Sequence, residues 1–214
     1  MVGIKVLEEI ESPINGKIQV VKSLGFGTYI QVEGLTQSGG VVYDVWRSTL
    51  RKIRSTKHEI RNCLILGLGG GSAAKLVRKF WSNAEIVGVD KDPVMIKMGK
   101  KYLGLGKVNI KITVADAFNF LKIPVRPHEP IPDRYGLVLV DLYIRDQVPR
   151  KFETYKFIRS VRHSLTESGL AVFNRLYWAE KRPEAMKFGQ KLEKIFPKVE
   201  YFYPEANVMF VCYT

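Results

Sequence analysis

The chain has 214 residues, of which 46% are hydrophobic and 26% charged; this suits one principal globular domain, and the net charge is +13. No apolar run approaches the ~20 residues that span a bilayer, and the opening MVGIKVLEEIES is acidic where a signal peptide is basic, so we expect a cytoplasmic protein without a membrane segment. Two distant cysteines, Cys63 and Cys212, provide neither a disulfide framework nor the ligand spacing of a metal site, and we expect neither.

The first 45 residues are predicted to form a small antiparallel β domain. Runs rich in β-branched and aromatic residues occur at 17–21, 29–32 and 41–45, and glycine-containing turns separate them. We therefore place a domain boundary between residues 45 and 46, and we assign residues 46–214 to the principal domain.

The segment after residue 45 is predicted to be an amphipathic helix with one basic face. Two stripes recur at helical spacing, an apolar one formed by Trp46, Leu50, Ile53 and Ile60 and a basic one formed by Arg47, Arg51, Arg54, His58 and Arg61. A solvated surface is the ordinary meaning of such a basic stripe, and a surface that attracts a polyanion is the alternative.

From residue 62 onward, predicted strands alternate with predicted helices. The strands lie at 63–66, 85–89, 109–114, 136–140, 170–174, 199–203 and 208–212. The helices lie at 72–81, 93–102, 115–121, 152–165 and 182–196. A Pro-rich insertion at 123–133 is either a lid or a surface connection. The pattern predicts an α/β fold with a mostly parallel seven-stranded sheet, helices on both faces, and ligands outside the carboxyl ends of the strands.

The sharpest local signal is LILGLGGGSAAKL, in which an apolar strand runs directly into glycines and then into a helix. Gly67, Gly69 and Gly71 allow the backbone to turn tightly and to approach a ligand closely. Asp90, followed by Lys91, ends the next strand, where a carboxylate can accept both hydroxyls of an adenosine ribose. Together these features predict an adenosine-containing ligand, and glycines that serve only a tight turn are the structural alternative.

The glycine loop by itself leaves the adenosine ligand open, because dinucleotides use the same strand, loop and helix. The spacing here is G-x-G-x-G, and Ser72 occupies the position of the third glycine in the dinucleotide pattern G-x-G-x-x-G. This spacing favours a ligand other than NAD.

Two further carboxylates lie at the ends of later predicted strands. Asp116 and Asp141 could each hydrogen-bond an adenine amino group, orient a nucleophile or take its proton. Helix capping is the alternative for Asp116, which precedes a predicted helix. We therefore interpret Asp141 as the candidate base, with Tyr143 either beside it at the site or buried as a packing residue.

Taken in order, these segments resemble the spermidine synthase family of class I S-adenosylmethionine-dependent transferases, over nearly the whole chain. IQVVKSLGFGTYIQVEGLTQS is similar to the small β domain of that family, with Gln19 at its cofactor-side glutamine. YGLVLVDLYIRDQVPRKFETYKFIRSVRHSLTESGLAVFN is similar to its catalytic strand and the elements that follow. The resemblance implies a class I methyltransferase-like, Rossmann-type fold, S-adenosylmethionine or its decarboxylated form as cofactor, and a homodimer or homotetramer.

The resemblance also implies which residues hold the cofactor. The three glycines of the loop would approach the methionine portion, and Asp90 with Lys91 would lie at the ribose. Asp116 with Ala117 would lie at the adenine, and Asp141 would lie beside the transferred group.

Several positions depart from the pattern of the aminopropyltransferases in this family. Gly70 stands where their G-G-G-D-G-G loop has its aspartate, and Ile144 stands at the second acid of their D-x-x-D segment. The expected mouth of the site carries arginines where a polycationic acceptor favours acids; these are Arg47, Arg51, Arg145 and Arg150. Arg47 could instead pair bidentately with the carboxylate that ordinary S-adenosylmethionine keeps.

The sequence therefore ranks methyl transfer to a small molecule first, by in-line attack in which Asp141 and Tyr143 help to position the reactants. Aminopropyl transfer from decarboxylated S-adenosylmethionine is the second hypothesis. A basic nucleic-acid-binding module or RNA methyltransferase is the third. No aromatic-rich motif for reading RNA accompanies the basic residues, so a small-molecule acceptor is favoured.

Overall fold

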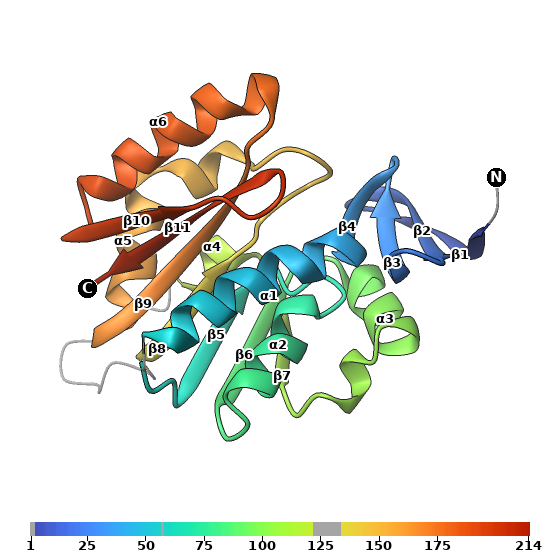
Figure 1. Cartoon of the computed structure of the whole chain (residues 1–214), viewed down its shortest axis with the longest axis horizontal. Coiled ribbons are helices and arrows are strands. Elements are labelled where there is room, and N and C mark those ends of the chain that lie inside the picture. The colour runs from blue at the N-terminus through green and yellow to red at the C-terminus, as the bar shows by residue number, and fades with distance from the viewer. Residues whose placement is uncertain (1–2, 57, 122–133) are drawn as a thin grey trace.

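The computed structural model describes residues 3–56, 58–121 and 134–214. An N-terminal antiparallel sheet, blue in Figure 1, consists of β1 (Ile4–Ser12), β2 (Gly16–Ser23), β3 (Gly27–Val32) and β4 (Leu35–Gly39) in that spatial order. This confirms the small β unit and the strands expected at 17–21 and 29–32. β1 and β4 were not predicted, since their alternating polar residues lack the β-branched runs of the other strands.

The predicted strand at 41–45 is wrong, because these residues belong to helix α1 (Gly40–Ser55). The run is β-branched, yet Val45 and Trp46 bury one helical face together with Leu50 and Ile53. Burial in the tertiary core therefore overrides the local preference for a strand. The helix ends at Ser55, so Ile60 packs into the same core from the segment that precedes the next strand.

A seven-stranded sheet with the order β10-β11-β9-β8-β5-β6-β7 forms the larger part of the molecule. Its strands are β5 (Asn62–Leu66), β6 (Glu85–Asp90), β7 (Lys111–Val114), β8 (Tyr135–Val140), β9 (Leu165–Leu176), β10 (Lys198–Phe202) and β11 (Asn207–Tyr213). The five strands from β9 to β7 are parallel, and β11 runs antiparallel to both of its neighbours, β9 and β10. The predicted class of sheet is confirmed. From β5 to β7 successive strands are added on one side of β5, and from β8 onward they are added on its other side. A ligand crevice is expected at the carboxyl ends of β5 and β8, where the strand order reverses.

Helices cover both faces of this sheet (Figure 1). α1, α2 (Ser72–Phe80) and α3 (Pro93–Tyr102) contribute to the core on one face, where Cys63 and Ile65 of β5 point. α4 (Ala117–Phe120), α5 (Tyr155–His163) and α6 (Arg182–Glu193) cover the other face, where Leu64 and Leu66 point. The alternation along β5 buries the strand on both sides, as a parallel sheet requires.

The boundaries of two predicted elements are corrected. The helix expected at 152–165 begins at Tyr155, because the short helix η2 (Arg150–Glu153) precedes it and the Thr154 hydroxyl caps its start. The strand expected at 170–174 already begins at Leu165. Two further short helices are η1 (Leu105–Lys107) and η3 (Ala179–Lys181). The Pro-rich insertion at 123–133 lies outside the described residues.

The small sheet packs directly on α3 and shares a core with it. Ile18, Val20, Ile30 and Val32 of the sheet contact Met95, Met98 and Leu103. Asp92 adds buried polar contacts, since its carboxylate accepts hydrogen bonds from Ser12 at 2.5 Å and Asn15 at 2.7 Å. The sheet itself ends at Gly39, and the division of the chain into domains at residue 45 stays a prediction.

Ser72 joins the two sheets at the start of α2. Its hydroxyl oxygen accepts a hydrogen bond from the Gly39 N–H at 2.8 Å and lies 3.0 Å from the Ser38 hydroxyl, and all three groups are buried. The serine at the third-glycine position thus has a structural role.

Replacing Ser72 by alanine leaves the buried Gly39 N–H without its acceptor. We expect the free energy of unfolding to fall by about 1–3 kcal/mol, measured by urea denaturation. Ser55→Ala is the control, because that hydroxyl lies exposed at the end of α1 and bonds only a nearby carbonyl. Equal effects of the two substitutions would contradict this role of Ser72.

None of the helices within the described residues has the length and apolar character needed to cross a membrane.

Candidate active site

A cavity of about 500 Å³ opens at the carboxyl ends of the parallel strands, between them and the small sheet. This volume lies within the range of small-molecule sites. Each of the predicted strand-end features contributes to its wall, and the lining includes Gly67, Gly69, Asp90, Lys91, Asp116, Ala117, Asp141 and Tyr143. Most of the predicted site residues are therefore brought together in one place.

Gly67 lies where the backbone after β5 crosses the backbone after β8. Its φ is +89°, and an added Cβ would lie 2.6 Å from the carbonyl carbon of Asp141 and still closer to its oxygen. The Asp141 N–H in turn donates to the Leu66 carbonyl at 2.8 Å. Only glycine fits this crossing, so the requirement for glycine comes from backbone contact as well as from ligand approach.

Of the other two predicted glycines, Gly69 lines the cavity and Gly71 packs against the core. Gly69 lines the cavity, and its N–H donates to Asp90 Oδ2 at 2.6 Å. Gly71 does not line the cavity; its φ is +91°, and a Cβ there would meet the Leu105 side chain at 2.6 Å. Gly71 therefore faces η1, and its contact with a ligand stays a prediction.

A side chain at Gly70 would require the ends of three neighbouring side chains to move. A Cβ at this position would lie 2.8 Å from Leu103, 2.9 Å from Ile30 and 2.9 Å from Ser38. The space that an aspartate would need is filled by the contact between the small sheet and the end of α3.

Asp90 ends β6 in the wall of the cavity. One carboxylate oxygen accepts the Gly69 N–H, and the other accepts the Asp92 N–H at 2.9 Å. Burial raises the pKa of Asp90, and these two backbone hydrogen bonds offset part of the rise. Each oxygen keeps a further lone pair, so the carboxylate can still accept hydroxyl groups from a ribose.

Asp116 caps helix α4, as its position before a helix suggested. Its Oδ1 accepts the Phe118 N–H at 3.1 Å, and its Oδ2 receives Lys151 Nζ at 2.5 Å. Burial alone raises the pKa of Asp116, but the hydrogen bond and charge of Lys151 outweigh it and lower that pKa overall. Asp116 and Ala117 both line the cavity, and their contact with an adenine stays a prediction.

Asp141 is held by donors from two elements. Trp46 Nε1 of α1 donates to its Oδ2 at 2.8 Å, and Asn174 Nδ2 of β9 donates to its Oδ1 at 2.8 Å. Burial raises the pKa of Asp141, and these hydrogen bonds together with the charge of Arg175 offset part of the rise. A carboxylate with a raised pKa in a cavity wall is suited to take a proton.

The Tyr143 hydroxyl is bound to the backbone of β9. It accepts the Leu176 N–H at 2.8 Å and donates to the Asn174 carbonyl at 3.4 Å. Burial raises the pKa of this hydroxyl above its ordinary value. Tyr143 thus lines the cavity, while its hydroxyl fixes the segment after β8 against β9.

Two predicted ligand contacts lie away from the cavity. Gln19 of β2 hydrogen-bonds Glu9 and Gln31 within the small sheet and is not among the lining residues. Arg47 pairs with Asp44 at 2.9 Å, and it too lies outside the lining. Successive helical residues point about 100° apart, so a helix that turns Trp46 inward turns Arg47 away.

Sequence reasoning missed three polar side chains of the cavity wall. Trp46 and Asn174 were assigned only to packing and to a strand, although both bind Asp141. Asn15, from the turn between β1 and β2, is buried and donates to Asp92, and its Oδ1 finds no hydrogen-bond partner in residues 3–56, 58–121 or 134–214. A polar residue before the glycine of a hairpin turn is the one signal that marked Asn15.

The cavity is acidic compared with the rest of the chain. Its charged lining residues are Asp90, Asp92, Asp116, Asp141, Lys91, Arg145 and Lys151. Two of the three cations are already paired, Lys151 with Asp116 and Arg145 with Glu33 at 3.2 Å. Because Lys151 neutralises Asp116, the remaining carboxylates are Asp90, Asp92 and Asp141 beside Lys91, and this excess in a chain of net charge +13 favours a cationic ligand. Within the part of the chain that the structure describes, no cluster of His, Cys, Asp and Glu is arranged to hold a metal ion.

Comparison with known proteins identifies the family of this chain. The spermine/spermidine synthase domain matches residues 47–208. Polyamine aminopropyltransferase 1 of Aquifex aeolicus (strain VF5) is 26% identical over 204 residues, which cover 92% of this chain and 70% of the relative. Polyamine aminopropyltransferase 2 of the same organism is 35% identical over 119 residues, which cover 51% of this chain and only 22% of the relative.

Solved structures confirm the fold. A spermidine synthase in complex with the transition state analogue AdoDATO superposes with a TM-score of 0.79 at 16% identity, covering 98% of this chain and 73% of that one. Human methyltransferase-like protein 13 in complex with SAH superposes with a TM-score of 0.62 at 20% identity, covering 81% of each chain. The fold is therefore of the class I methyltransferase-like, Rossmann type that the sequence predicted.

Proposed function

This chain belongs to the spermine/spermidine synthase family, and from that premise we propose that it transfers an aminopropyl group from decarboxylated S-adenosylmethionine to a small amine. The observation that carries the proposal is the excess of carboxylates in the cavity of a strongly basic chain. Both proposed substrates are cationic, since the donor is a sulfonium with a free amine and the acceptor is an amine. Carboxylates in a partly desolvated cavity attract such ligands.

This proposal reverses the order of the first two hypotheses from the sequence. Methyl transfer was ranked first because Arg47 was expected to pair with the carboxylate of S-adenosylmethionine. The Arg47 guanidinium instead pairs with Asp44 outside the cavity, which removes that argument. The similar aminopropyltransferases support the second hypothesis, and the general class of transferase is unaffected.

The donor would lie along the glycine loop, with its ribose hydroxyls at Asp90 and its adenine near Asp116 and Ala117. Asp141 would accept a proton from the attacking amine while the new C–N bond forms and the C–S bond breaks. Trp46 and Asn174 hold both oxygens of this carboxylate, so its orientation is fixed before substrates bind. The leaving group is then methylthioadenosine.

Product analysis tests the proposal. The chain is incubated with decarboxylated S-adenosylmethionine and a panel of diamines and polyamines, and the nucleoside products are identified by mass spectrometry. Methylthioadenosine, with a mass increase of one aminopropyl group on the amine, is the expected result. S-adenosylmethionine in place of the decarboxylated donor is the matched control, and formation of S-adenosylhomocysteine from it would overturn the proposal.

Methyl transfer from S-adenosylmethionine is kept as a second candidate because of one observation. Gly70 stands where the aminopropyltransferases that the sequence resembles carry the aspartate that helps to hold the donor, and the methyl groups of Leu103 and Ile30 occupy the space beside it. The same product analysis separates the two, since methyl transfer releases S-adenosylhomocysteine. A basic RNA-binding role stays the third hypothesis.

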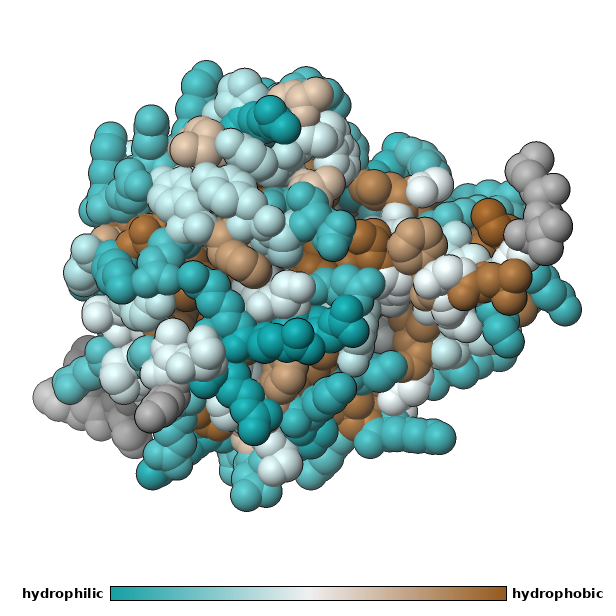
Figure 2. All heavy atoms as spheres, viewed as in Figure 1, coloured by the Kyte–Doolittle hydropathy of each residue, from teal (hydrophilic) through white to brown (hydrophobic). Residues whose placement is uncertain are grey.

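A homodimer or homotetramer is also proposed. Figure 2 shows apolar side chains gathered over the end of the molecule formed by the small sheet. Ile4, Val6, Leu24 and Phe26 are 68%, 47%, 84% and 63% exposed there. Exposed apolar groups in one patch favour association between chains, and sedimentation equilibrium tests for it.

A further inference from the structure

Arg175 of β9 is a buried cation with few partners. The residue is 4% exposed, and its guanidinium lies 3.7 Å from the centre of the Phe188 ring of α6. Nη1 donates to the Asn174 carbonyl at 2.8 Å, and Nε lies 3.9 Å from a carboxylate oxygen of Glu153. Nε and Nη2 have no hydrogen bond from any part of the chain that the structure describes. A charge buried with so little compensation destabilises the folded state. Its presence therefore points to a role other than stability.

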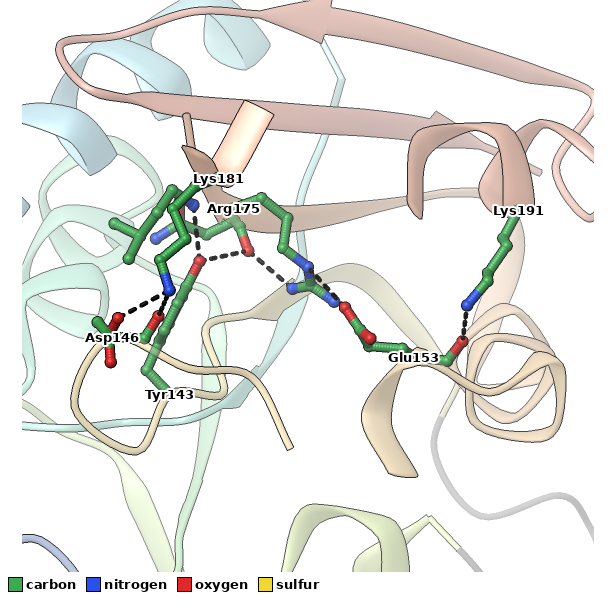
Figure 3. Close-up of polar contacts among 8 residues, drawn as sticks. Tyr143, Asp146, Glu153, Arg175, Lys181 and Lys191 are labelled. Atoms are coloured by element: carbon green, nitrogen blue, oxygen red, sulfur yellow. Dashed lines mark hydrogen bonds and ion pairs between the residues drawn. The ribbon is translucent and has the colours of Figure 1, made fainter. Parts of the chain in front are cut away.

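The guanidinium is connected to the cavity wall through Asn174 (Figure 3). The Asn174 carbonyl accepts both Arg175 Nη1 and the Tyr143 hydroxyl, and the Asn174 side chain donates to Asp141. Figure 3 shows Arg175 lying between Tyr143 on one side and Glu153 of η2 on the other. Arg175 itself does not line the cavity, so any effect on the site passes through these neighbours.

We propose that Arg175 is a positioning residue, whose buried charge and hydrogen bond to Asn174 hold Tyr143 in place and stabilise the ionised form of Asp141. The inference rests on the proposed function only for the role of Asp141 as base. A merely structural Arg175 would join β9 to Phe188 and Glu153 and would leave the ionisation of Asp141 unchanged.

The charges around Asp141 support this assignment. Its neighbours on α1 and β9 that bond it directly, Trp46 and Asn174, are neutral. The charged and titratable groups nearby are Arg175 of β9, Tyr143 and Asp146 after β8, Glu153 of η2 and Lys181 of η3. Lys181 and Asp146 neutralise each other at 2.7 Å, and Arg145 pairs with Glu33, while Arg175 is the buried cation that hydrogen bonds link to Asp141 through Asn174. Its charge lowers the pKa of Asp141, against the rise that burial causes.

The indole N–H of Trp46 provides a readout that needs no substrate. It donates to Asp141 Oδ2, so its NMR cross-peak should move as Asp141 gains a proton. The chain has three tryptophans, and Trp81→Phe and Trp178→Phe identify the peak of Trp46. We expect the midpoint of this titration to rise by roughly one pH unit in Arg175→Met, because an opposite charge that lowered the pKa has been removed.

Glu153→Gln gives a second test with the opposite sign. Loss of this carboxylate on the far side of Arg175 leaves more of the cationic charge to act on Asp141, so the midpoint should fall. Arg182→Met is the matched control for Arg175→Met, since it removes an exposed guanidinium of α6 with the same change in net charge, and it should leave the midpoint unchanged. Arg175→Lys should restore most of the parent midpoint.

An unchanged midpoint in folded Arg175→Met, or shifts of the same sign in Arg175→Met and Glu153→Gln, would overturn the proposal. If Arg175→Met does not fold, Arg175→Gln, whose side-chain amide can still donate to the Asn174 carbonyl, provides the same measurement, and an unchanged midpoint there would overturn the proposal. In the transfer assay the acid limb of the kcat profile should move with the same signs, while KM for the donor stays constant. Absence of any transfer would contradict the proposed function, and the indole titration would still decide the role of Arg175.

Discussion

Replacing Asp141 by asparagine is expected to lower turnover by about 10²- to 10⁴-fold, the range typical for loss of a positioned general base. The amide has nearly the shape of the carboxylate, but it cannot take a proton, and it can accept a hydrogen bond from only one of its donors, Trp46 and Asn174. Binding of decarboxylated S-adenosylmethionine should change little. Steady-state kinetics with the donor and amine identified above, together with calorimetry of donor binding, measure the two effects separately.

Asp146→Asn is the matched control for this prediction. Asp146 lies five residues further along the same segment and pairs with Lys181 at the surface, where water screens the interaction. Its loss should change turnover only slightly. A large loss in Asp146→Asn with nearly full activity in Asp141→Asn would show that the second acid, and not the buried one, takes the proton.

Gly67→Ala is expected to lower the free energy of unfolding by about 4 kcal/mol or more, in the range reserved for severe steric or core defects. Its methyl group would overlap the carbonyl of Asp141, and the backbone there cannot yield without separating β5 from β8. A φ of +89° adds strain for any residue with a side chain. Denaturation in urea measures the loss, and donor binding should disappear with it.

Gly104→Ala separates steric overlap from backbone strain. Gly104 also has a positive φ, +74°, but a Cβ at this position would meet nothing within 4 Å. This variant should lose only about 1–2 kcal/mol, the penalty of a left-handed conformation. If the two substitutions had equal effects, the contact between Gly67 and Asp141 would not matter to stability.

Most of the larger sheet was predictable because its inner strands β5, β8, β9 and β11 are buried, so each contains a short apolar run in the sequence. The same logic failed at residues 41–45, where β-branched residues form the first turns of α1. Val45 is buried there in a core cluster that also contains Ile65 and Leu139 of the central strands, far along the chain. Local preference does not include such contacts.

The candidate site was predictable where a carboxylate residue follows a predicted strand. Asp90, Asp116 and Asp141 each follow an apolar run, and all three line the cavity. Their partners were not predictable, since Trp46 and Lys151 reach Asp141 and Asp116 from elements far along the chain. Trp46 lines the cavity and Arg47 does not. Neighbouring residues of a helix point in different directions, and the sequence alone did not show which of the two faces the cavity.

The contacts of Asp92 make the two sheets interdependent. One carboxylate oxygen receives Ser12 and Asn15 from the small sheet, while the other caps α3 through Val94 and Met95. A chain truncated before residue 46 would lose those two partners and would uncover the methionines that the small sheet covers. We therefore expect the two sheets to unfold in a single cooperative transition.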